Sequence, residues 1–339
     1  MIELLTIVAR YGRAAMVFGL LAGFALPQLA ATLKPWLPEL VAGLLFLNGF
    51  RIGASRALAG LREGISSLKT VVVLQMILPV VALLCFAGLG LLATPLAIAV
   101  ILMLAAPSLT GSPNITQLMG HAPEPAFRLM ILGTALMPLT VLPVLLLLPK
   151  LGDAQTVLLA ALRLSGTIAL TVGLAFICRH LLARDLKERM ASAVDGLTIV
   201  ALVVIVIGLM AALGPAFHSA PWPVAQWMLL ALGLNFGLQY ACFRWLMWRG
   251  GRKIAVPTSV VAGNRNFALF LIALPASTTE PLLIFLGCYQ VPMYLTAVVM
   301  RPIYAKALNP PRDRARTGPW SSTITQGRCA PSRRRTLPS

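Results

Sequence analysis

The sequence predicts an all-α integral membrane protein with ten transmembrane helices, arranged as two inverted five-helix repeats. Of the 339 residues, 58% are hydrophobic and only 11% are charged, whereas a soluble domain carries about 25% charged residues. Long apolar runs recur along the whole chain, and the basic residues fall almost entirely on one side of the membrane that these runs define. Composition, span count and charge distribution therefore agree on the fold class.

Ten apolar runs are candidates for membrane-spanning helices, because a helix needs about 20 mostly apolar residues to cross the hydrocarbon core. They are residues 14–33, 38–52, 71–92, 95–119, 129–148, 156–178, 193–213, 224–248, 256–274 and 281–303. The second run is short, and the fourth and ninth are interrupted. We expect residues 1–308 to form one membrane transporter domain. Residues 309–339, with arginines scattered among Pro, Ser and Thr, are expected to form a disordered basic cytoplasmic tail.

The basic residues orient these spans. Of the 28 Lys and Arg residues, 24 fall on one side of the membrane, and only Lys34 and Lys150 fall on the other. Arg163 and Arg265 lie within spans. Because cytoplasmic loops carry an excess of basic residues, we expect both termini to be cytoplasmic and the protein to lie in the cell inner membrane. One missed helix would invert every later loop, so the partition supports the span count.

The fourth and ninth spans occupy equivalent places in the two halves, and both contain helix-breaking sequences. Each carries a Gly-x-x-Asn motif among prolines and hydrogen-bonding side chains. The candidate substrate- and ion-binding residues in these breaks are Thr110, Ser112, Asn114 and Thr116 in the fourth span and Gly263, Asn264, Arg265 and Asn266 in the ninth. Unwound backbone at membrane depth is tolerated only where protein buries it or water reaches it, and broken helices in inverted repeats form the binding sites of secondary transporters. The alternative is that Pro and Gly only kink packed helices.

Polar residues and prolines recur in a fixed order along these spans. They are Gln75 and Pro79 in the third, Pro107, Thr110, Ser112 and Asn114 in the fourth, Thr134 and Pro138 in the fifth, and Gly263, Arg265 and Asn266 in the ninth. In this order and spacing the chain resembles the bile acid:sodium symporter family over residues 14–306. The resemblance implies ten helices in inverted repeats, with the fourth and ninth helices unwound and crossing beside the sodium sites. It adds Gln75 and Thr134 to the candidate binding residues.

The departures from that family concern the sodium ligands. Val261 stands where the resemblance implies a glutamate that serves both sodium sites, and Arg265 stands where it implies a glutamine. Pro113 occupies the place of a ligand asparagine, with Asn114 one position late, and Met130 replaces a serine. All ten acidic residues fall in loops, in the tail or at span ends, so no carboxylate remains at the midplane to neutralise a bound cation.

Arg265 places a permanent positive charge in the middle of an apolar span, which costs at least about 2.5–3.5 kcal/mol on insertion scales. We expect its guanidinium to occupy the space of the lost sodium and to donate to carbonyls of the unwound segments and to Gln75, Thr134 or Asn114. There it either holds the crossing together or attracts an anionic substrate. The alternative is that Arg265 snorkels to an interface or only braces the packing.

Two further polar residues, Asn235 and Gln239, lie one helical turn apart in the eighth span and so share a face. Gln239 occupies roughly the symmetry position of Gln75, and the pair either contributes to the site or bridges neighbouring helices. Asn48 is expected to serve packing rather than binding. The five cysteines show no paired spacing, so neither disulfides nor a metal site is expected.

These features favour a secondary transporter that moves a small organic anion or amphipathic acid by alternating access, with sodium coupling weakened or lost. The alternatives are a conventional sodium-coupled symporter of the family, a related arsenite or auxin-type carrier, and a non-transporting paralogue. The spans lack the buried acid, base or nucleophile of an intramembrane enzyme. No cofactor is expected, sodium being the one ion that the resemblance suggests. The expected partners are the anion and the lipid bilayer, not nucleic acid, with the chain a monomer or weak homodimer.

Overall fold

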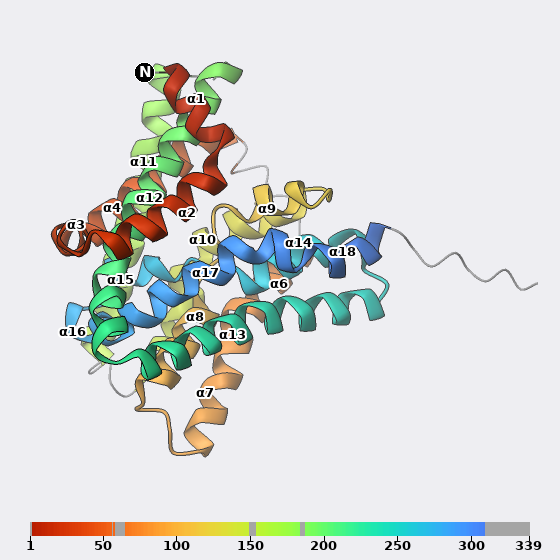
Figure 1. Ribbon diagram of the computed structural model, residues 1–339. Helices are drawn as coiled ribbons and strands as arrows, with labels where there is room; N and C mark the ends of the chain where they lie inside the picture. Colours follow the sequence, from red (N-terminus) through yellow and green to blue (C-terminus); the bar gives the residue numbers. More distant parts are fainter. Residues whose placement is uncertain (1, 56, 58–64, 149–153, 184–186, 309–339) are drawn as a thin grey trace, which may run out of the picture.

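The computed structural model describes residues 2–308, apart from residues 56, 58–64, 149–153 and 184–186 (Figure 1). Every regular element in this part of the chain is a helix, and an isolated bridge is the one β-type pairing there. The predicted all-α fold is therefore confirmed. The predicted tail at residues 309–339 lies outside the described residues.

The first helix group gathers elements from the N-terminus and the middle of the chain. It comprises α1 (Ile2–Arg10), α2 (Gly12–Ala25), α3 (Pro27–Leu33), η1 (Lys34–Trp36), α4 (Leu37–Ile52), α11 (Ala154–Leu182) and α12 (Glu188–Ser219). Helix α12 is its centre, because α1, α2, α3 and α4 all pack against it, and α11 packs against α4. In Figure 1 the red N-terminal helices accordingly lie beside the green α11 and α12.

The second helix group contains the remaining elements. It comprises α6 (Ile65–Val72), η2 (Val73–Ile77), α7 (Leu78–Gly88), α8 (Pro95–Ala105), α9 (Ser112–Leu118), α10 (Glu124–Leu146), α13 (Pro221–Trp248), α14 (Arg252–Gly263), η4 (Phe267–Leu269), α15 (Phe270–Ala273), α16 (Ala276–Thr279), η5 (Glu280–Leu282), α17 (Leu283–Val299) and α18 (Arg301–Leu308). Every residue of α8 from Ala97 to Ala105 is buried, as expected for a helix that is apolar on all sides. The two groups meet where α12 packs on α17 and α10 packs on α11.

Six helical stretches of the described chain are long and apolar enough to cross a membrane. They are Pro27–Ile52, Ile65–Gly88, Glu124–Leu146, Gln155–Leu182, Glu188–Ser219 and Ala276–Ala305. A seventh results if the bent pair α1 and α2 forms one span. Helix α13 is long enough to cross a membrane, but Asn235 and Gln239 in its middle lower its mean hydropathy. The fourth and ninth predicted spans are divided into helices that are each too short to cross. The count of ten spans therefore remains a prediction.

The predicted boundary between the first two spans is wrong. The predicted first span ends at residue 33, and the predicted short second span begins at residue 38. In the structure α2 ends at Ala25, and a helical stretch continues from Pro27 to Ile52. Pro27 has no N–H with which to extend α2, and it fits the first turn of a new helix. Pro35 and Pro38 likewise lie in the first turns of η1 and α4, where a missing N–H is tolerated, so they do not end the stretch.

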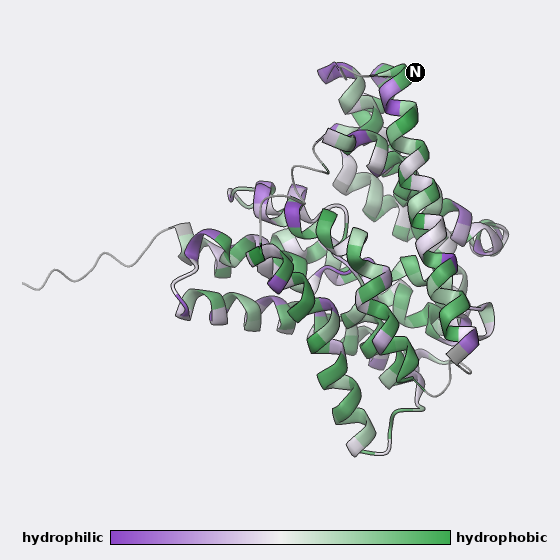
Figure 2. Cartoon of the chain, turned by 180° about the vertical axis from the view of Figure 1, so that it is seen from behind, coloured by the Kyte–Doolittle hydropathy of each residue, from purple (hydrophilic) through white to green (hydrophobic). Residues whose placement is uncertain are grey.

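Hydrophobic residues predominate along most of the helices (Figure 2), and many of the large ones are exposed. Leu139, Leu181 and Leu182 are 70%, 74% and 78% exposed, and similar residues occur on most of the long helices. Large exposed apolar surfaces are rare on soluble monomers. With the spans described above, it identifies the chain as a membrane protein.

Candidate functional site at the crossing of two broken helices

The fourth and ninth predicted spans are both broken, as expected. Helix α8 ends at Ala105 and α9 begins at Ser112, while α14 ends at Gly263 and helical structure resumes at Phe267. In the second break the backbone of Asn264 is extended, with φ −100° and ψ 96°. Prolines in the first break and the Gly-Asn sequence in the second remove or weaken the helical hydrogen bonds that would bridge these gaps.

The two breaks pair with each other, and we call residues 106–111 and 264–266 the crossing. The N–H of Leu109 donates to the carbonyl of Asn264 over 2.8 Å, and the N–H of Asn266 donates to the carbonyl of Pro107 over 2.8 Å. Ser108 and Arg265 consequently form an isolated antiparallel bridge. Each unwound segment thus satisfies backbone groups of the other, which is what lets non-helical backbone exist at membrane depth.

Arg265 is buried inside the second helix group, with only 1% of its surface exposed. Its Nε donates to the carbonyl of Ala262 over 2.8 Å, its Nη1 to Ala106 over 3.0 Å, and its Nη2 to Leu74 over 3.2 Å. These three carbonyls, which we call the carbonyl cage, come from three different helical elements. None of Gln75, Thr134 and Asn114, the three expected side-chain acceptors, receives a hydrogen bond from this guanidinium within the described chain.

Each carbonyl of the cage lacks a helical donor, and the local backbone explains why. The N–H of Leu78 donates to Val73 in the π-helical turn η2, and the residue five positions after Leu74 is Pro79, which has no N–H. The carbonyl of Leu74 is therefore left free. Ala106 and Ala262 lie at the ends of α8 and α14, where the last carbonyls of a helix have no internal partner. Arg265 supplies donors to all three.

No carboxylate accompanies this buried charge among the described acids. Glu3, Glu39, Glu124, Glu188 and Glu280 are all exposed, and Asp195 is bound by Arg51 over 2.7 Å. Within the described chain, the guanidinium of Arg265 is thus surrounded by carbonyl oxygens and by no carboxylate, as a metal cation held by carbonyls would be. The described residues also contain no cluster of His, Cys, Asp and Glu that could hold a metal ion.

A buried polar network surrounds the second break. Asn235 Nδ2 donates to the carbonyl of Gly263 over 2.7 Å, and Gln239 Nε2 donates to Asn235 Oδ1 over 2.6 Å. Thr296 donates to Asn264 Oδ1 and accepts from Gln239, each over 3.1 Å. All of these side chains are fully buried. Asn235 and Gln239 thus connect α13 to the end of α14 and to α17, which is the bridging role expected as one alternative. Their part in binding stays a prediction.

The other predicted site residues are divided between the crossing and its surroundings. Thr110 accepts a hydrogen bond from Asn48 Nδ2 of the first helix group over 3.1 Å, a role that the packing interpretation of Asn48 did not include. Ser112 accepts from Ser108 over 2.9 Å, and Thr116 donates to the carbonyl of Ser112.

Gln75 lies beside the cage carbonyl of its neighbour Leu74, and its Oε1 accepts from Thr140 over 3.5 Å. Asn266 is half-buried, and its side chain has no hydrogen bond within the described chain. Thr134 is also half-buried. Asn114 is exposed on α9, so the structure does not bring it to the crossing.

A small cavity lies between the two helix groups at the crossing. Its walls are Val41, Leu44, Leu109, Leu202, Ile205, Val206, Arg265, Asn266, Phe267, Ala268, Leu286, Tyr289, Gln290 and Met293. About 20 Å³ of this space is open to water-sized molecules, which suffices for water but not for an organic molecule. The walls are mainly apolar, with the amides of Asn266 and Gln290 as polar groups. The site is therefore closed in this structure.

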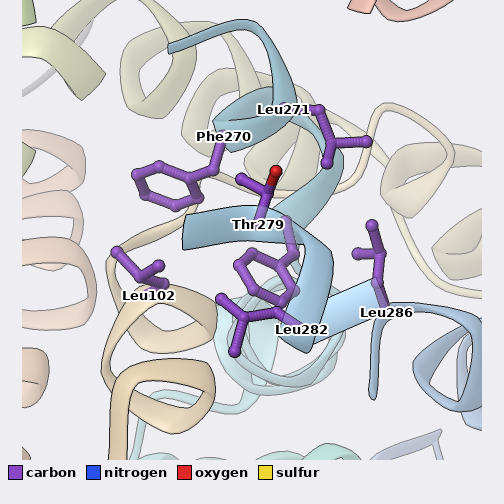
Figure 3. Close-up of a pocket in the computed structure, with 7 residues that line it drawn as sticks. Leu102, Phe270, Leu271, Thr279, Leu282 and Leu286 are labelled. Carbon is purple, nitrogen blue, oxygen red and sulfur yellow. The ribbon is translucent and has the colours of Figure 1, made fainter. Parts of the chain in front are cut away.

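A second cavity, of about 10 Å³, lies where α8 meets the end of the broken ninth span (Figure 3). The side chains of Leu102, Phe270 and Leu286 converge on it, and the hydroxyl of Thr279 bonds back to carbonyls of its own helix. Without available polar groups this space is a packing gap.

Four residues of the crossing and its surroundings are not predicted by the sequence pattern: Leu74, Tyr289, Gln290 and Thr296. Tyr289 donates its hydroxyl proton to the carbonyl of Gly263, and Gln290 lines the cavity. A signal was available for Tyr289 and Thr296, because polar residues seven positions apart in an apolar span share one helix face. The role of Leu74 is a backbone role, which residue type alone does not reveal.

No model of a protein family matches this chain, and a search of the curated proteins found no match. The family resemblance therefore rests on the residues quoted for it above. The function is inferred below from the geometry of the crossing.

Proposed function

We propose that the protein is a secondary transporter, of the bile acid:sodium symporter type, that moves a small organic anion or amphipathic acid without sodium coupling. One observation carries this proposal. The guanidinium of Arg265 is enclosed by the carbonyls of Leu74, Ala106 and Ala262, an all-oxygen environment of the kind a hard cation prefers. Arg265 thus acts as a cation that is permanently attached to the protein.

The charge of Arg265 opposes binding of a second cation at the crossing. Two unit charges 4 Å apart interact with about 4 kcal/mol at an effective dielectric constant of 20, and no described carboxylate offsets this repulsion. The same charge favours an anion in the adjoining cavity, whose apolar walls suit a hydrocarbon body and whose Asn266 and Gln290 amides can donate to a carboxylate. The substrate class follows from these two features.

Alternating access is supported by the arrangement of the two helix groups. The cavity lies between them, with α4 and α12 on one side and the crossing and α17 on the other. Rocking of the first helix group against the second would open this space to one side of the membrane at a time, while the crossing moves as part of the second group. The described spans hold no buried carboxylate to carry protons, so uniport or exchange is the simplest transport mode.

Internal symmetry supports the transporter architecture. Thr140 donates to Gln75, joining the third and fifth predicted spans, and Gln239 donates to Thr296, joining the eighth and tenth. The same Gln–Thr pairing thus occurs at equivalent places in the two proposed repeats. With the basic residues on the cytoplasmic side, both termini lie in the cytoplasm of an inner-membrane protein that acts as a monomer or weak homodimer.

Uptake into proteoliposomes tests this function. A panel of radiolabelled organic acids, from short hydroxy and keto acids to a bile acid, is offered with and without sodium and pH gradients. We expect flux of at least one acid that follows its own gradient and does not respond to sodium. Sodium-driven accumulation would instead support the conventional symporter, flux of arsenite or auxin but of no other acid would support the related carriers, and no flux at all would support a non-transporting paralogue.

A further inference from the structure

The C-terminal end of α13 carries an arginine stacked on two exposed tryptophans. The Arg249 Cζ atom lies 4.7 Å from the ring centroid of Trp245 and 5.6 Å from that of Trp248. The two rings are themselves 5.5 Å apart, and they are 54% and 75% exposed. The indole faces hold the guanidinium from one side, as in cation–π stacking.

A well-defined turn fixes this arrangement. The N–H groups of Gly250 and Gly251 donate to the carbonyls of Met247 and Leu246, and Gly250 has φ +78°, which closes α13 with a Schellman-type cap. Arg249 therefore has a set backbone position at the end of the helix, immediately before α14. The basic residues Arg252 and Lys253 follow within the first turn of α14.

No described acidic residue pairs with this cluster. The chain has no Asp or Glu between Asp195 and Glu280. Within the described residues, the side chains of Arg249, Arg252 and Lys253 have neither a hydrogen bond nor an ion pair. Stacking occupies only the face of the Arg249 guanidinium, so its five in-plane N–H donors remain available in a geometry that matches phosphate oxygens.

The ends of α13 are placed to reach the membrane surface. The helix has 28 residues and is therefore about 42 Å long at 1.5 Å per residue, longer than a hydrocarbon core of about 30 Å. Trp222, which is 70% exposed, marks its other end. Tryptophans collect at the two interfaces of a bilayer, so the predicted eighth span places Trp245 and Trp248 at headgroup height.

We propose that Arg249, Trp245 and Trp248 form a binding site for the phosphodiester headgroup of an anionic phospholipid. The guanidinium donates to the phosphate oxygens, the indoles pack against the glycerol and upper acyl region, and Arg252 and Lys253 add attraction for the net negative charge. The site lies on the same helix as Asn235 and Gln239, so lipid binding here braces the helix that holds the crossing.

Native mass spectrometry of the purified full-length chain tests this site. The probes are phosphatidylglycerol, phosphatidylcholine with the same acyl chains, and soluble glycerol 3-phosphate. We expect wild type to retain phosphatidylglycerol at least fivefold better than phosphatidylcholine and not to retain glycerol 3-phosphate. Arg249→Gln and the double variant Trp245→Ala/Trp248→Ala should each lose this preference.

Arg252→Gln is the matched control, because it removes the same charge from the same turn without touching the indoles. It should keep most of the preference for phosphatidylglycerol. If Arg249→Gln and Arg252→Gln lost the preference for phosphatidylglycerol equally, the lipid would be held by the overall positive charge of the region, and the proposed site would be overturned. Unchanged retention in Arg249→Gln, or retention of glycerol 3-phosphate at the level of the lipid, would overturn it as well. These readouts do not depend on transport, so they fail or succeed separately from the proposed function.

Discussion

At the scale of single residues, Arg265 has two linked consequences. It supplies hydrogen-bond donors to three carbonyls that helix breaks and Pro79 leave free, and it places a fixed positive charge where no described carboxylate lies. The first consequence concerns stability and the second concerns ion selectivity. The two can be separated by substitution.

Arg265→Met should destabilise the protein strongly, because it leaves the carbonyls of Leu74, Ala106 and Ala262 without donors in a dry interior. Each buried unsatisfied group costs about 1–3 kcal/mol, so a total loss of about 3 kcal/mol or more is expected. Arg265→Lys should recover part of it, since one ammonium cannot reach all three carbonyls. Thermal unfolding in detergent measures both.

The matched control is Arg163→Met, because Arg163 is the second arginine that lies within a predicted span. Arg163 is exposed on α11, so its loss should change stability by less than about 0.5 kcal/mol. Equal melting temperatures for Arg265→Met and Arg163→Met would show that the cage contributes nothing to the fold.

Gly263 is required by the close approach of α13 to the crossing. A Cβ atom there would lie 2.3 Å from Cγ of Gln239 and 2.4 Å from the backbone oxygen of Asn235. The second contact is with backbone and cannot be relieved by a rotamer change, so Gly263→Ala should prevent folding. Size-exclusion chromatography should then show no monodisperse peak for this variant. Gly237→Ala on α13 has no atom within 4 Å of the new Cβ and should fold normally. A well-folded Gly263→Ala protein would contradict this packing.

At the scale of helical elements, the sequence predicted what local chemistry decides. Both broken spans could be predicted, because Pro107 and Pro113 remove helical hydrogen bonds and the Gly-Asn sequence from Gly263 weakens a helix. The boundary between the first two spans could not, because Pro27, Pro35 and Pro38 all lie in the first turn of a helix. Nothing local shows that α2 ends before Pro27 while the helical stretch continues through Pro35 and Pro38. The cage partner Leu74 depends on a π-helical turn whose backbone pattern appears only in three dimensions.

Two hydrogen-bonded side-chain contacts join the helix groups in the described chain. Asn48 contacts Thr110 near the crossing, and Lys34 in η1 contacts Glu280 in η5 over 2.6 Å. By the predicted topology the second contact lies on the external side. Under the proposed transport mechanism, an ion pair there would hold the two groups together on that side and favour a closed exterior.

Lys34→Glu should open the external side more often. An exposed ion pair contributes about 0.2–1 kcal/mol, so the labelling rate of Gln290→Cys in the cavity by an external thiol reagent should rise up to about fivefold. Adding Glu280→Lys should bring the rate back by restoring the pair in reverse. The native cysteines also react with the reagent, and labelling of the protein without the Gln290→Cys substitution measures their contribution. If the double variant Lys34→Glu/Glu280→Lys were labelled at position 290 as fast as Lys34→Glu alone, this contact would not control access to the cavity.

At the scale of the whole molecule, the protein combines an apolar exterior, two helix groups and a closed cavity at their junction. The low charged fraction, which first indicated a membrane protein, also shapes the proposed mechanism, because few acidic residues are present. A bound sodium ion needs negative charge nearby, and the described chain has Arg265 at the crossing and no carboxylate beside it. Adding a carboxylate and removing the arginine should reverse this, so Val261→Glu combined with Arg265→Gln is expected to create a sodium-dependent rise in melting temperature.

The replacement of a bound cation by Arg265 is tested by the melting temperature of the purified wild-type protein in NaCl and in KCl at equal ionic strength. A ligand present at 100 times its dissociation constant adds about 2.7 kcal/mol of stability, which a melting curve resolves readily. We predict identical melting temperatures in the two salts. A sodium-specific rise in the wild-type protein would show that an ion still binds at the crossing, and would contradict the role assigned to Arg265.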